Sequence, residues 1–151
     1  MLIVSIMGRL GSQHEGKNSR LARKIQQAIS EIDGLGIALE NVQVQISPEV
    51  ESSLPEGCID VGVVYFSDDE TLTPEMRREL AESIFIQFYD VMTVNEIRNV
   101  SLLRVIIQEI GLVQEDLCGV HPLLAITKRT DLEEKGIFSG SFPHWKFYRC
   151  P

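Results

Sequence analysis

The chain has 151 residues, of which 44% are hydrophobic and 24% are charged, and its formal net charge is −8 at pH 7. This length and composition suit one globular domain with a proper core. No segment approaches the roughly 20 consecutive apolar residues of a membrane-spanning helix. No basic stripe is present to neutralise phosphates, which supplies most of the affinity for nucleic acid. We therefore expect neither a membrane nor a nucleic acid as partner.

The cysteines and histidines argue against two further classes of protein. The cysteines are odd in number and widely separated: Cys58, Cys118 and Cys150. The three histidines lack the short spacings of a metal site. We therefore expect free thiols, no disulfide framework, no metal and no other cofactor. The chain starts on an apolar segment without the basic region or cleavage site of a signal peptide, so we expect a cytoplasmic protein.

Residues 1–50 have the pattern of a β-α-β unit. Residues 2–7 are apolar on both faces, which is typical of a strand covered on both sides. Apolar side chains at helical spacing between Leu21 and Ile32 predict a helix. Residues 42–46 alternate Val or Ile with Gln, which predicts a strand with one exposed face. Two residues are candidates for the N-cap of the helix: Asn18 and Ser19.

Residues 58–110 repeat this pattern. An apolar strand is expected over residues 59–66 and another over residues 100–107. Between them, Thr73 is placed to cap a helix and Pro74 occupies its first position, where a missing N–H costs nothing. Apolar residues then mark one face of this helix as far as Met92.

Two β-α-β units with right-handed crossovers predict a four-stranded mixed sheet with both helices on one face. We therefore expect a fold of the α/β class, or α+β in the classification that separates mixed sheets. The other face of this sheet is far from polar. A second copy of the chain is its natural cover, so we expect self-association.

Residues 111–151 form a C-terminal extension of the same single domain. A short strand is expected over residues 123–126. The segment from Ile137 to Pro151 holds half of the ten aromatic residues of the chain. So much apolar area is expected to dock, either on its own domain or on a neighbouring subunit.

The loop after the first strand contains a near match to a phosphate-binding loop, with Gly11, Gly16 and Lys17 at the required spacing. Asn18 stands where a hydroxyl should hold Mg²⁺, and the loop starts four residues after the strand. A loop that needs glycine for its turns is the alternative interpretation.

Arg104 is a charge within an otherwise apolar strand, on the same face as Leu102 and Ile106. An arginine that faces inward needs an anionic partner or ligand, whereas one that faces outward at a strand edge is ordinary. Both interpretations stay open.

Several stretches resemble the tautomerase superfamily, in the branch that includes 5-carboxymethyl-2-hydroxymuconate isomerase and macrophage migration inhibitory factor. The stretch from Thr73 through Phe85 to Leu103 resembles the second helix and strand of that isomerase, and residues 120–124 resemble the segment that follows. A strand at the very start and two β-α-β units of similar length complete the resemblance, which is one of layout and covers most of residues 1–126.

The resemblance implies a homotrimer with sheets inside and helices outside, and pockets between subunits around the N-terminus. Its implied catalytic base is an N-terminal proline, which moves a proton between carbons of an enol or keto acid. Leu2 stands at the matching position, so no catalytic residue is carried over. If the protein is an enzyme, the resemblance implies an isomerase.

These observations lead to one main hypothesis and two alternatives. The main one is a tautomerase-like homotrimer that is catalytically silent or binds a small anionic metabolite near Met1, Phe66 and Arg104. The first alternative is a ferredoxin-like interaction or regulatory module without a small-molecule site. The second is a nucleotide-binding enzyme that uses the loop from Gly11 to Lys17.

Overall fold

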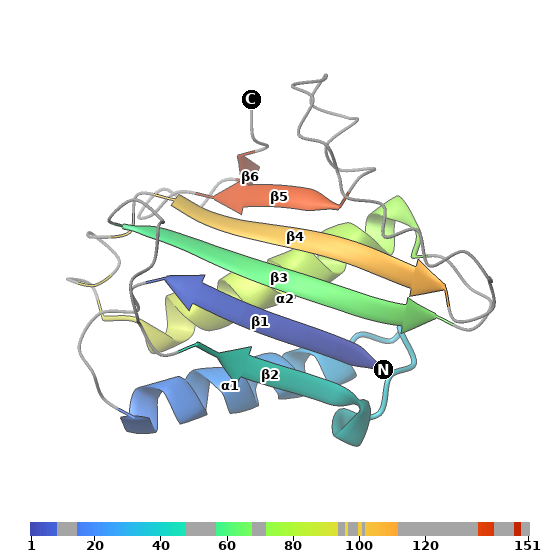
Figure 1. Ribbon diagram of the computed structural model, residues 1–151, viewed down its shortest axis with the longest axis horizontal. Coiled ribbons are helices and arrows are strands. Elements are labelled where there is room, and N and C mark those ends of the chain that lie inside the picture. Colours follow the sequence, from blue (N-terminus) through green and yellow to red (C-terminus); the bar gives the residue numbers. More distant parts are fainter. Residues whose placement is uncertain are drawn as a thin grey trace.

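A computed structural model describes residues 1–8, 15–47, 57–67, 72–93, 96, 100, 102–111, 136–140 and 147–148. Its elements in chain order are β1 (Leu2–Gly8), α1 (Glu15–Ser30), the 3-10 turn η1 (Leu39–Asn41), β2 (Val42–Ile46), β3 (Cys58–Ser67), α2 (Pro74–Val91), β4 (Leu102–Gly111), β5 (Ile137–Gly140) and β6 (Phe147–Tyr148). Figure 1 shows one sheet with both helices behind it.

The strands lie in the order β2-β1-β3-β4-β5-β6. β1 is parallel to β2 and β3 is parallel to β4, and the two pairs join through antiparallel β1 and β3. A helix connects the two strands of each parallel pair, as such a connection requires. The two predicted β-α-β units and the mixed α+β sheet are thus confirmed.

The expected number of four strands is wrong. β5 pairs with β4 in antiparallel fashion and β6 pairs with β5, so the C-terminal extension lengthens the sheet at one edge. Pairing satisfies backbone groups along the outer edge of β4, which would otherwise be open. Ile137 and Phe138 of β5 are fully buried, so this part of the extension covers its own domain. The strand expected over residues 123–126 lies outside the described residues.

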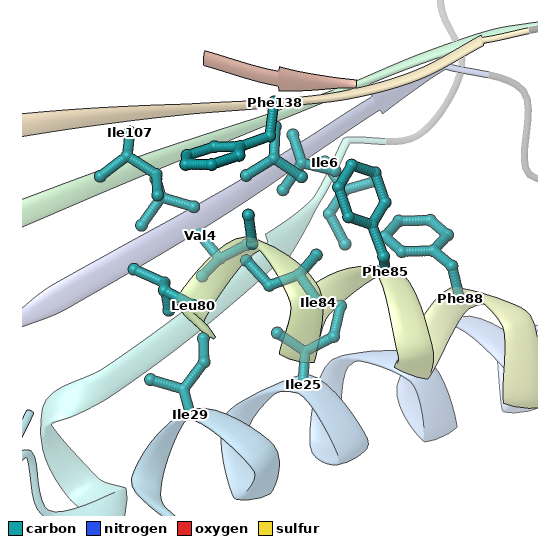
Figure 2. Close-up of a cluster of buried hydrophobic side chains, with 14 of the residues drawn as sticks. Val4, Ile6, Ile25, Ile29, Leu80, Ile84, Phe85, Phe88, Ile107 and Phe138 are labelled. Carbon is teal, nitrogen blue, oxygen red and sulfur yellow. The ribbon is translucent and has the colours of Figure 1, made fainter. Parts of the chain in front are cut away.

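The main core lies between the sheet and the two helices. Leu2, Val4 and Ile6 of β1 are fully buried, and the residues between them point to the other face, as strand geometry dictates. Figure 2 shows how side chains of α1 and α2 meet the sheet from below, and how Phe138 of β5 joins the same cluster.

The helix boundaries agree with the sequence for α2 but not for α1. The Oγ1 of Thr73 accepts a hydrogen bond of 3.2 Å from the backbone N–H of Met76, which confirms the predicted cap. α1 starts at Glu15, so the prediction of Asn18 or Ser19 as its N-cap is wrong; both lie within the helix. Apolar spacing could not locate this start, because the first turn carries no apolar side chain. No helix among the described residues is long and apolar enough to cross a membrane.

Candidate functional site

The face of the sheet that the helices leave uncovered is the main candidate surface (Figure 1). Residues that alternate with the core positions point to it. In β1 and β2 these residues are Ile3, Ser5, Met7, Gln43 and Gln45. In β3 and β4 they are Cys58, Asp60, Gly62, Val64, Phe66, Leu102, Arg104, Ile106, Gln108 and Ile110. We call this surface the open face; among these positions Asp60 and Arg104 alone carry charge.

Arg104 pairs with Asp60 on the open face. The two residues are direct neighbours in the parallel register of β3 and β4. The Nε of Arg104 donates to Oδ1 of Asp60 at 2.9 Å, and one terminal nitrogen donates to Oδ2 at 2.6 Å. Such a two-point contact is the strongest geometry that a guanidinium and a carboxylate can adopt. The anionic partner that the sequence required for an inward arginine is therefore present within the same chain.

Asp60 was missed in the sequence, although a signal for it existed. Asp60 and Arg104 each interrupt an apolar stretch of a strand, on the face opposite to the core residues. Strand register decides whether two such charges meet, and register depends on the whole sheet rather than on either strand alone.

Met1 and Phe66 meet at the other end of the open face. The backbone N–H of Phe66 donates to the carbonyl oxygen of Met1 at 2.9 Å, and the Met1 side chain is exposed. Phe66 lies six positions after Asp60 along β3, which corresponds to about 20 Å at roughly 3.3 Å per residue. Within one chain, the structure thus brings Met1 and Phe66 together but leaves Arg104 distant from both.

Leu2, which the resemblance matches to the proline of the family, is an interior residue in the structure. Leu2 is fully buried on the helix side of the sheet, between Val42 of β2 and Tyr65 of β3. A side chain in this place packs in the core and offers no group for proton transfer.

The near match to a phosphate loop is described only in part. Gly11 lies outside the described residues, whereas Gly16 and Lys17 lie in the first turn of α1. The Nζ of Lys17 forms an ion pair with the carboxylate of Glu96, beyond the end of α2. The second carboxylate oxygen of Glu96 is buried without a hydrogen-bond partner. A carboxylate in this place competes with any phosphate for the lysine.

A polar hollow of about 530 Å³ lies between α1 and the edge strand β2. Arg23 and Gln26 line it from the helix, and residues 42–45 of β2 line it from the strand. Gln26 donates to the carbonyl oxygens of Leu39 and Val42, so its side chain ties α1 to the start of β2. Among the described residues, no cluster of His, Cys, Asp and Glu is arranged to hold a metal ion.

The outer surface of the helices carries charges of both signs. Arg20 and Arg23 of α1 are exposed, as are Glu75, Glu79 and Asp90 of α2. Asp90 lies beside Lys24 of α1, whose hydrogen bond and positive charge lower the pKa of this carboxyl. The helix side therefore carries many charged residues, whereas the open-face positions named above carry only the Asp60–Arg104 pair.

Solved structures share this fold. A member of the cis-3-chloroacrylic acid dehalogenase family superimposes with a TM-score of 0.55 at 17% identity, over 78% of this chain and 80% of that one. A native fused 4-OT gives 0.51 at 14% identity, over 78% and 93%. A fused 4-OT solved as an asymmetric trimer gives 0.52 at 13%, over 78% and 93%. No family model and no curated protein matches the chain. These structures belong to the tautomerase superfamily, so the predicted resemblance is confirmed for the fold.

Proposed function

We propose that the chain is a homotrimeric protein of the tautomerase fold that lacks proline-dependent chemistry and binds a small anionic metabolite at the boundary between subunits. The observation that carries this proposal is the open face, which has a largely uncharged and partly apolar surface although no helix in the described part of the chain covers it. The few, widely spaced cysteines support a reducing compartment such as the cytoplasm.

Self-association is supported by the contrast between the two faces of the sheet. The helix face is sealed by α1 and α2, whereas the open face presents Ile3, Val64 and Ile106 among polar neighbours. Surfaces of this composition mark contact sites between proteins. A solved structure with the same fold is a trimer, and the match covers 93% of its chain.

Subunit contact also gives the proposed ligand site its physical basis. Met1 and Phe66 lie about 20 Å from Arg104 within one chain, at roughly 3.3 Å per strand residue. A pocket that contains all three residues therefore needs Met1 and Phe66 from one copy and Arg104 from another. A small organic anion in this pocket would compete with Asp60 for the guanidinium of Arg104, and Phe66 would form the apolar wall.

The position of Leu2 supports the absence of proline-dependent chemistry. Its side chain is an interior packing residue, and a buried leucine cannot accept a proton. We expect no tautomerisation of phenylpyruvate above the rate in buffer. Turnover that rises in proportion to protein concentration would contradict this part of the proposal.

The assembly is tested by light scattering and sedimentation velocity over a range of protein concentrations. We expect a particle of three times the 17.0 kDa of one chain. A single chain at all concentrations would overturn the proposal, because the site would then be incomplete.

The ligand site is tested by thermal denaturation with phenylpyruvate as the anionic probe. A probe at 100 times its Kd stabilises the folded state by about 2.7 kcal/mol. We expect this stabilisation to disappear in Arg104→Gln and to persist in Arg78→Gln, a matched change on α2, away from the open face. An equal effect of phenylpyruvate on both variants would exclude Arg104 from the site.

A further inference from the structure

Gly62 lies in the interior of β3, a central strand, where glycine is an unfavourable residue. It lowers strand stability because the unfolded chain loses more freedom there and no side chain packs. A glycine in such a place needs a reason. Three are available: a positive φ, a close approach within the chain, or a close approach by another molecule.

The first two reasons apply to other glycines but not to Gly62. Gly8 and Gly136 have φ values of 127° and 73°, and a Cβ on either would come within 2.7 Å of a backbone oxygen. Gly62 has no positive φ, and among the described residues the nearest heavy atom to a Cβ would be the oxygen of Ser5 at 4.0 Å. The isolated chain would thus accept a side chain at this position.

The surroundings of Gly62 indicate what approaches it. Ser5 of β1 and Ile106 of β4 are its register partners, and the Asp60–Arg104 pair lies one step along the same face. The missing side chain leaves room among these neighbours at the centre of the open face. The backbone of Gly62 therefore lies between an apolar side chain, that of Ile106, and a polar one, that of Ser5.

Charge favours a second copy of the chain as the occupant. The chain has a net charge of −8, so the net electrostatic force between two copies is repulsive. On the open face the charges of Asp60 and Arg104 cancel within one chain, and the other residues are neutral. This surface is therefore one on which two copies meet without opposing like charges.

We propose that a neighbouring copy seats a side chain against Gly62, beside the Asp60–Arg104 pair, and that this contact helps to hold the proposed homotrimer together. The inference rests on the proposed function, because it names the point of contact within that assembly. Gly62 is then a residue that specifies self-association rather than the fold.

The variant Gly62→Val tests this inference, because valine suits a strand but fills the space that the neighbouring copy needs. Gly16→Ala is the matched control, since Gly16 also has no heavy atom near a Cβ but lies on α1. We expect Gly62→Val to keep the circular dichroism spectrum of the wild type and to weaken self-association at least tenfold in sedimentation velocity. Gly16→Ala should associate as the wild type does.

The possible outcomes separate this inference from the proposed function. A trimeric wild type with an equally trimeric Gly62→Val would overturn the inference alone. A Gly62→Val variant that stays trimeric but is no longer stabilised by phenylpyruvate would also overturn it, because the occupant would then be the small molecule. A monomeric wild type would overturn both. If Gly62→Val does not fold, Gly62→Ala decides by the same measurement.

Discussion

The contribution of the Arg104–Asp60 ion pair to stability depends on how far the two side chains are buried. Their side chains are 25% and 14% exposed, so water screens the pair only in part. Loss of the carboxylate would leave a half-buried guanidinium without its charged partner. We expect Asp60→Ala to lower the free energy of unfolding by about 1–2 kcal/mol, measured by urea denaturation.

The control for this prediction is Asp90→Ala, which breaks the exposed ion pair with Lys24. Solvent screens that pair more strongly, so its loss should cost less. The lowered pKa of Asp90 stabilises the folded protein above the pKa of the unfolded carboxyl, and this contribution is lost as the pH falls through the lower folded value. Equal losses for the two variants would show that burial does not strengthen the Asp60–Arg104 pair.

At the scale of elements, the start of α2 is anchored twice. Thr73 caps the helix, and Glu109 at the end of β4 accepts hydrogen bonds from the backbone N–H of Leu72 and from Arg77. These contacts join the helix to the strand that follows it. We expect Thr73→Ala to lower the free energy of unfolding by about 1 kcal/mol, with Thr73→Ser close to the wild type because its hydroxyl remains. A similar loss in both variants would point to the methyl group instead of the cap.

At the scale of the whole molecule, β5 joins the C-terminal extension to the core. Phe138 is 1% exposed and packs on the helix side of the sheet with Ile107 (Figure 2). We expect Phe138→Ala to lower the free energy of unfolding by about 3–5 kcal/mol in urea denaturation.

Ile86→Ala is the control for Phe138, because Ile86 is 52% exposed on α2 and should change stability by less than about 0.5 kcal/mol. A loss below about 1 kcal/mol for Phe138→Ala would show that β5 contributes little to the core, and that residues 1–111 carry the stability.

Much of the fold could be predicted because its determinants are local. The alternation of Val42, Val44 and Ile46, the apolar face of each helix, and the Thr73-Pro74 start are all written within a few neighbouring residues. The start of α1 was missed since its first turn has no apolar residue, and β5 and β6 were missed since short strands depend on the edge that they join.

The sequence by itself determined the two β-α-β units, the single-sided placement of the helices and the presence of one charge within the strand of Arg104. Only the tertiary structure decided that Asp60 meets this charge, that Phe66 lies about 20 Å away at roughly 3.3 Å per residue, and that Gly62 has open space above it. The physical reason is the distance along the chain over which each determinant acts. Periodicity and capping involve residues close in the chain. Strand register joins residues about 40 positions apart, and a slip of one residue would turn every side chain to the other face.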